Sequence, residues 1–100
     1  MAKKTLKGLH KNPAELASTR LVSALNAQVG NEMHASLQYV SIAAHFDSEN
    51  LPQLAAFFYR QAAEERDHAL KFVKFVVDVG GRVAIPAVAA PRAAFSSAAE

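Results

Sequence analysis

The stretch Glu64-Glu65-Arg66-Asp67-His68, together with Glu32 about thirty residues earlier, decides how the chain folds. Glu65 and His68 are three positions apart, so they share one face of a helix. An isolated Glu-x-x-His pair arises often by chance on solvated helix faces, but this pair interrupts an apolar seam. Alternating steps of four and three residues give the members of that seam: Leu54, Phe58, Gln61, Glu65, His68, Phe72, Phe75 and Val79.

A second seam with the same stepping precedes it in the chain. Its members are Leu21, Leu25, Gln28, Glu32, Ala35, Tyr39, Ile42 and Phe46. Placing an ionised carboxylate in an apolar seam costs on the order of several kcal/mol unless another charge compensates. Glu32 and Glu65 therefore indicate a site for a divalent cation.

Length and composition limit the class of protein. The chain has 100 residues, of which 51% are hydrophobic and 20% charged, which is typical of one small globular domain. Cysteine is absent, so the chain has neither a disulfide nor a thiolate metal site, as in a reducing compartment. It also lacks a membrane-spanning apolar stretch and a secretory signal pattern. We expect a cytoplasmic location, including the interior of a protein compartment, and no membrane partner.

The net charge of +2 is unevenly distributed. Residues 1–20 carry about +4 and the remaining residues about −2, counted from the printed sequence. A basic arm of this kind binds nucleic acid poorly when it has no aromatic side chains for bases to stack on. The pattern therefore favours a solvated arm, with no nucleic-acid partner.

Two long helical segments dominate the chain, and strand-like alternation is missing. The first starts near Asn12-Pro13 and is firmly helical from Ser18 to Phe46. After a polar break, Asn50 is expected to cap a second helix, with Gln53 completing a capping box. That helix is predicted to end near Val79, before Gly80-Gly81.

The sequence therefore divides into a basic arm (1–17), a helical hairpin (18–80) and an extended tail (81–100). Pro86 and Pro91 lie in the tail among small apolar residues, so we expect it to run as extended chain over a surface. Ser97-Ala98-Ala99-Glu100 has the form of a capping box at which a third helix would begin.

The two helices must lie antiparallel because the break between them is short. Glu32 lies about 17 residues before the turn near Glu49, whereas Glu65 and His68 lie about 16 and 19 residues after it. At about 1.5 Å per residue, all three lie roughly 24–28 Å from the turn. Because they are level and on facing seams, we predict that they form one metal site.

These residues resemble the first half of the ferritin family, especially bacterial non-haem ferritins, over about residues 20–95. The spacing of Glu32, Tyr39 and the 64–68 stretch is similar, as are several segments. These are Gln38-Tyr39-Val40-Ser41-Ile42-Ala43, His45-Phe46-Asp47-Ser48-Glu49, Leu51-Pro52-Gln53-Leu54 and Gly81-Arg82-Val83.

The resemblance implies roles for individual residues in a di-iron centre. Glu32 and His68 would be terminal ligands of one iron, and Glu65 would bridge two irons. Tyr39 would be a hydrogen-bonding aromatic neighbour, and Glu64 an accessory acidic position. Haem-binding relatives carry Met where this chain has Arg66, so no haem is expected.

Ligand chemistry from the residues themselves agrees with iron. Carboxylates are hard ligands and one imidazole per metal suits Fe(II), although Mn or Zn are open as substitutes. Gln28 and Gln61, one turn from the site, are expected to be hydrogen-bonding residues or register-setting polar layers rather than ligands. His34 and His45 are expected on the surface.

The chain departs from the family in having two bundle helices rather than four. A ferritin-like site takes one Glu from each of two helices and one Glu-x-x-His from each of the other two. This chain supplies half of that set. We therefore predict an all-α, antiparallel two-helix hairpin that completes a ferritin-like four-helix bundle by homodimerisation, alone or within a higher homo-oligomer, a plan similar to that of two-helix encapsulated ferritins.

The predicted function is that of a ferroxidase, which oxidises Fe(II) to Fe(III) with O₂ or peroxide and serves iron storage and detoxification. Its catalytic residues would be Glu32, Glu65, His68 and Tyr39. Two alternatives remain open at this point. One is a catalytically inert two-helix oligomerisation module, and the other is a truncated piece of a longer ferritin.

Overall fold

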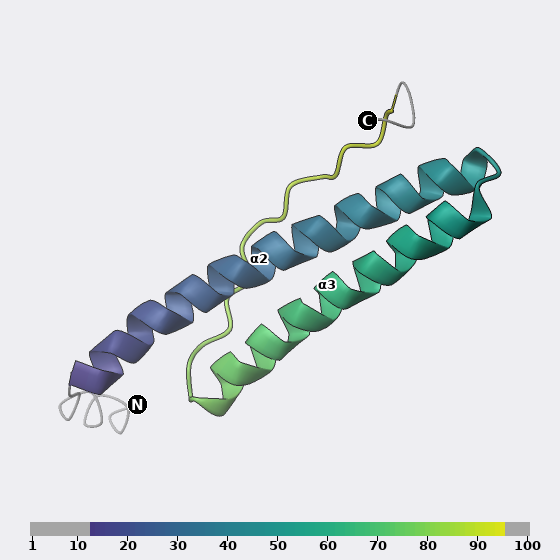
Figure 1. The fold of residues 1–100 in the computed structure, drawn as a ribbon. Coiled ribbons are helices and arrows are strands. Elements are labelled where there is room, and N and C mark those ends of the chain that lie inside the picture. Colours follow the sequence, from purple (N-terminus) through teal and green to yellow (C-terminus); the bar gives the residue numbers. More distant parts are fainter. Residues whose placement is uncertain (1–12, 96–100) are drawn as a thin grey trace.

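The computed structural model describes the backbone of residues 13–95 and the side chains of residues 19–95. It contains helix α2 (Pro13–Ser48) and helix α3 (Pro52–Asp78), which run antiparallel and pack along their length (Figure 1). Residues 13–95 include no strand, so the prediction of an all-α hairpin is confirmed. No helix in this part of the chain is long and apolar enough to cross a membrane. The predicted Asn12 cap and the 97–100 capping box lie outside the described residues.

Helix α2 ends in a motif that the sequence did not predict. Asn50 adopts a left-handed conformation with φ of 61°. Its N–H donates to the carbonyl of Asp47 at 3.1 Å, and the N–H of Leu51 donates to the carbonyl of Phe46 at 2.9 Å. These two bonds form a Schellman motif, which satisfies carbonyls at the C-terminus of the helix.

The prediction that Asn50 caps the second helix is therefore wrong. The N-cap of α3 is Leu51, and no side chain makes a capping hydrogen bond there, so the capping box with Gln53 is absent. Asn50 tolerates positive φ better than most residues, and it serves the end of α2 instead. Pro52 occupies the first turn of α3 as predicted.

The predicted stop of α3 at Gly80-Gly81 is confirmed. Gly80 has φ of 77°, a region that glycine enters without the steric cost of a Cβ. Its N–H donates to the carbonyl of Val77 at 3.0 Å, and the N–H of Gly81 donates to that of Val76 at 2.9 Å. Both helices thus end in the same type of motif.

The closest contact between the helices lies beside the predicted seams rather than on them. Most of the buried residues recur every seven positions: Val29, Ser36 and Ala43 on α2, and Ala55, Ala62, Ala69 and Val76 on α3. Gly30 is buried as well, and so is Phe46, a member of the predicted seam near the turn. Small side chains at this spacing let the two backbones approach. The Ser36 hydroxyl donates to the carbonyl of Ala62 at 2.8 Å, which adds a buried polar tie.

Placing Leu54, Phe75 and Val79 at the interface of the single hairpin was therefore wrong. Their exposed fractions are 44%, 44% and 48%. They follow the same side of α3 as His68, because they lie near whole numbers of turns from it. Their apolar surface is available on the side of the hairpin that carries the metal-ligand residues.

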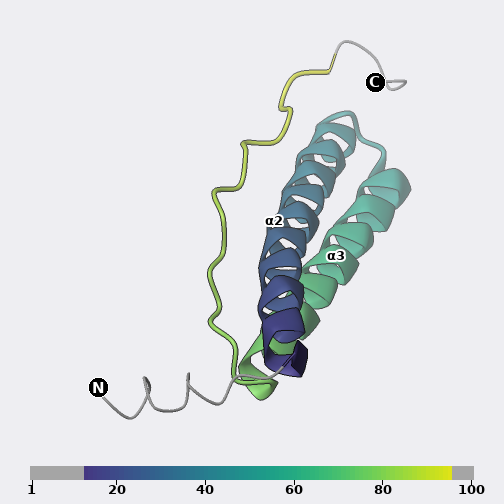
Figure 2. The same ribbon diagram turned by 90° about the vertical axis from the view of Figure 1, so that its left-hand side faces the viewer.

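Residues 82–95 lie along α2 as a segment without helix or strand, on the side away from α3 (Figure 2). Helix α2 holds the backbone of this segment through polar side chains. The Asn26 amide donates to the carbonyl of Arg82 and accepts from the N–H of Ala84, both at 3.0 Å. The Gln38 amide accepts from the N–H of Arg92 at 2.8 Å and donates to its carbonyl at 3.1 Å.

The glycine in the middle of α2 has a packing role. Gly30 costs a helix about 1 kcal/mol relative to Ala. A Cβ at this position would lie 2.6 Å from Cγ of Pro86, so the segment can approach α2 only because the side chain is missing. The sequence shows the cost of Gly30, whereas the structure shows what the residue permits.

We expect Gly30→Ala to release residues 82–95 from α2 while leaving the helix intact. The added methyl group collides with the rigid ring of Pro86, although Ala itself favours the helix. Hydrogen exchange at the amides of Ala84 and Arg92 should accelerate at least tenfold, with unchanged far-UV circular dichroism. Ser23→Ala, at an exposed position of the same helix, is the control. Unchanged exchange in Gly30→Ala would contradict this packing.

Candidate metal centre

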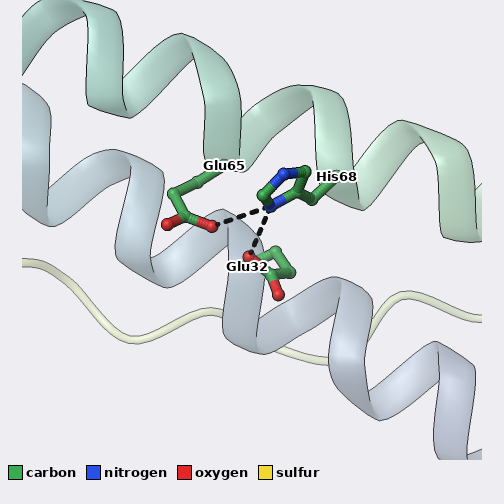
Figure 3. A group of neighbouring side chains, drawn as sticks. All are labelled: Glu32, Glu65 and His68. Atoms are coloured by element: carbon green, nitrogen blue, oxygen red, sulfur yellow. Dashed lines mark hydrogen bonds and ion pairs between the residues drawn. The ribbon is translucent and has the colours of Figure 1, made fainter.

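The two helices bring Glu32, Glu65 and His68 together (Figure 3). Glu32 comes from α2, whereas Glu65 and His68 lie one turn apart on α3. His68 Nδ1 lies 3.3 Å from Glu65 Oε1 and 3.7 Å from Glu32 Oε1. The level arrangement that the residue counting predicts is therefore present in the structure.

The three residues can present their ligand atoms to one point. One ligand atom from each lies within 4.8 Å of the others. The side chains of Glu32 and Glu65 are 17% and 22% exposed, whereas that of His68 is 51% exposed. The cluster therefore has a sheltered base formed by the two carboxyls and opens to solvent past the imidazole.

The two carboxyl groups shift each other's pKa in opposite directions. The pKa of Glu32 lies below its ordinary value of 4.5, chiefly because its carboxylate accepts a hydrogen bond from Glu65; Gln28 and His68 add to this, and burial opposes it. The pKa of Glu65 lies above 4.5, raised by that hydrogen bond, then by burial, then by the negative charge of Glu32. Glu65 is therefore the carboxyl that loses its proton at the higher pH of the two, as expected of coupled acids.

A cation fits this cluster. Two adjacent carboxylates repel each other when both are ionised unless a positive charge lies between them. Carboxylate and imidazole are ligands for Fe(II), Mn(II) and Zn(II). The donor set and its electrostatics thus match a divalent metal that enters as a proton leaves.

The structure does not gather every residue that the sequence singles out. Within the described residues, the group of ligand atoms holds Glu32, Glu65 and His68, and the exposed Glu64 is not part of it. Tyr39 is half-buried, and its ring centroid lies 5.9 Å from that of Phe58. The roles of Tyr39 and Glu64 remain hypotheses.

The other histidines of the described chain are engaged elsewhere. His34 Nδ1 lies 3.1 Å from the carbonyl of Ala89 in the extended segment. The ring of His45 lies 5.1 Å from that of Phe95. Both are half-buried against residues 82–95, rather than on the open surface where we expected them.

A hydrogen-bonding pair beside Glu32 extends the cluster. Gln28 Nε2 donates to Glu32 Oε2 at 3.0 Å, as its position one turn away suggests. Asn31 Nδ2 donates to Gln28 Oε1 at 3.1 Å. Sequence reasoning missed Asn31, because an exposed Asn on a helix carries no signal beyond its spacing of three from Gln28.

With this geometry established, comparison with known proteins gives the family. The model of the ferritin-like domain matches residues 22–100, and the chain belongs to this family. It is 50% identical over 70 residues to ferritin BfrB of Mycobacterium tuberculosis, covering 70% of this chain and 39% of that protein. It is 39% identical over 82 residues to the bacterial non-heme ferritin of Staphylococcus aureus, covering 82% of this chain and 49% of that protein.

Solved structures agree with the sequence relatives. The open pore ferritin of the hyperthermophilic archaeon Archaeoglobus fulgidus superposes with a TM-score of 0.73 at 37% identity, covering 78% of this chain and 48% of that one. A PmFTN variant from a crystal soaked in iron gives a TM-score of 0.73 at 36% identity, covering 79% and 51%. The chain thus spans about half the length, or less, of the relatives it matches.

The electrostatics predict how the stability of the metal-free protein depends on pH. Because the folded pKa of Glu65 is raised, its stabilising contribution is complete below 4.5 and is lost as pH rises through the folded pKa. The lowered pKa of Glu32 gives a contribution that is present above 4.5 and lost as pH falls through its folded pKa. Metal-free protein should therefore lose stability as pH rises from 4.5 through the folded pKa of Glu65.

We expect Glu65→Gln to raise the Tm of metal-free protein by a few degrees at pH 8 and hardly at all near pH 4.5. The amide keeps a donor toward Glu32 and cannot ionise, and about 1 kcal/mol shifts the Tm of a domain this small by about 4–8 °C. Differential scanning calorimetry in chelator measures the effect. Glu64→Gln, at the exposed neighbour, should show no such pH-dependent gain. An equal Tm for parent and Glu65→Gln at both pH values would argue against a raised pKa of Glu65.

Proposed function

We propose that this chain binds Fe(II) at Glu32, Glu65 and His68 and oxidises it to Fe(III), in the service of iron storage and detoxification. One observation carries the proposal: two carboxylates and an imidazole from two helices present ligand atoms within 4.8 Å of one another. The ferritin relatives support iron as the metal, and one of them was studied in crystals soaked in iron.

Each residue has a distinct part in the proposed reaction. Glu32 and His68 would hold one iron as terminal ligands, and Glu65, 3.3 Å from His68, would bridge to a second iron. Each Fe(II) loses one electron, so two irons together reduce O₂ to hydrogen peroxide with uptake of two protons, or peroxide to water. Tyr39 is proposed as a hydrogen-bonding neighbour, and the exposed Glu64 as an accessory acidic residue.

We also propose that two subunits share the site. Three ligands from one chain are half of what a ferritin-like di-iron site uses. The side of the hairpin that carries His68 is open, and it is bordered by exposed apolar side chains. These are Leu21, Leu54, Phe57, Phe75 and Val79. A second copy packed there would cover this surface and bring its own Glu32, Glu65 and His68, about a two-fold axis.

A second candidate function is an inert two-helix oligomerisation module. The large apolar side chains left exposed on both helices favour it, because such surface is typical of interaction sites whether or not chemistry occurs there. Anaerobic titration with Fe(II), followed by air, separates the two candidates. A saturable Fe(III) absorbance with a break near one iron per chain supports oxidation, and the absence of a break supports the inert module.

Replacing a ligand should abolish iron oxidation without unfolding the protein. We expect Glu65→Ala and His68→Ala each to lower the initial rate of Fe(II) oxidation by more than the ~10–100-fold that is typical of losing an outer hydrogen-bonding partner. Helicity should persist, because neither side chain fills the interface. Stopped-flow absorbance and circular dichroism measure the two quantities. Oxidation at the parental rate in either variant would rule out the assigned site.

Metal should promote association of the chains. If metal bridges two copies, its affinity adds to that of the dimer, so Fe(II) under anaerobic conditions, or Zn(II), should shift monomers to dimers by mass action. Analytical ultracentrifugation with and without metal tests this. Mixing Glu32→Ala chains with His68→Ala chains should restore little activity, because a mixed dimer has no complete ligand set. A stable monomer that oxidises Fe(II) fully at micromolar concentration would contradict the shared site.

A further inference from the structure

The two carboxylate oxygens of Glu32 have different surroundings. Oε2 accepts a hydrogen bond of 3.0 Å from Gln28 Nε2, one turn earlier on α2, in a partly buried position. Oε1 faces the cluster and lies 3.7 Å from His68 Nδ1. One oxygen is thus held by the helix that carries it, and the other is left for the metal.

The Gln28 amide is itself oriented. Its oxygen accepts from Asn31 Nδ2 at 3.1 Å, so its nitrogen faces Glu32. Turning the amide over would place its oxygen against the carboxylate, and two acceptors in contact repel each other. Asn31, Gln28 and Glu32 lie within one turn and a half of α2, so the chain of hydrogen bonds needs no other element.

Gln61 on α3 provides a comparison within the same molecule. It stands four residues before Glu65, just as Gln28 stands four residues before Glu32. Among the described residues, hydrogen bonding of this kind links only Gln28 to its glutamate. The carboxyl of Glu65 instead contacts His68 across one turn of α3, through Oε1 at 3.3 Å.

We propose that Gln28 is a positioning residue that restricts Glu32 to binding metal through Oε1 alone, with Asn31 fixing the Gln28 amide. The inference rests on the proposed metal site and deepens it. A carboxylate can bind a metal through one or both oxygens. If Gln28 holds one oxygen, Glu32 occupies one coordination position of the metal rather than two. A further coordination position then stays open, as catalytic metal sites require.

The test uses Co(II), because its d–d absorption reports coordination number without any oxidation. Removing the donor in Gln28→Leu frees Oε2, so Glu32 should bind through both oxygens and the molar absorption should fall as coordination number rises. Co(II) affinity should also weaken, by about 10–100-fold, because the carboxylate loses its fixed orientation. Asn31→Ala should change both quantities in the same direction by less, and it covers the case in which Gln28→Leu fails to fold.

Gln38→Leu is the matched control. It makes the same chemical change on the same helix and removes both hydrogen bonds that Gln38 makes to Arg92. If Gln28→Leu acted only by disturbing the structure, Gln38→Leu should affect Co(II) binding at least as strongly. We expect instead that the Co(II) spectrum and affinity of Gln38→Leu stay parental. Parental Co(II) spectra in both Gln28→Leu and Asn31→Ala overturn the proposal, as does a parent chain that takes up no Co(II). If the parent chain binds Co(II) but does not oxidise Fe(II), only the proposed oxidation is wrong. The Co(II) spectra then still decide the role of Gln28.

Discussion

The rest of this molecule depends on one constraint: two carboxylates lie next to each other where the antiparallel helices pack. The hydrogen bond between Glu65 and Glu32 raises the pKa of Glu65 and lowers that of Glu32. Small residues at every seventh position bring the helices close enough to create this contact. Ionising both carboxyls at this place is unfavourable, and a divalent cation bound there, with His68 as a further ligand, would relieve the repulsion.

The same packing leaves the hairpin with apolar surface on two sides. Bulky residues flank the small ones, so they are displaced to the edges of the interface and exposed. One group lies beside His68, and another, including Tyr59, Leu70 and Val77, follows a different side of α3. The segment 82–95 covers a third surface, on α2, through backbone hydrogen bonds and the contact of Pro86 with Gly30. The apolar group beside His68 stays exposed, so it is the surface that a partner subunit could cover at the metal centre.

Periodicity and rise per residue were sufficient to predict the hairpin and the meeting of Glu32 with Glu65 and His68, because both depend on regular helix geometry. They could not place Asn50, because an Asn at this position can either end the first helix in a left-handed conformation or cap the start of the second. They also missed the seven-residue small seam, because alanine contributes little to a hydrophobic pattern. The contacts of Gly30 and Asn31 depend on tertiary packing and amide orientation, for which a sequence carries no periodic signal.

The central claim is that metal binds where the two helices bring their ligands together. Crystals grown with Fe(II) under anaerobic conditions, with anomalous scattering recorded on both sides of the iron absorption edge, test it directly. We expect an iron peak with oxygen or nitrogen atoms of Glu32, Glu65 and His68 at about 2.0–2.2 Å, the usual range for such ligands. An iron peak elsewhere on the chain, with these three side chains unligated, would contradict it.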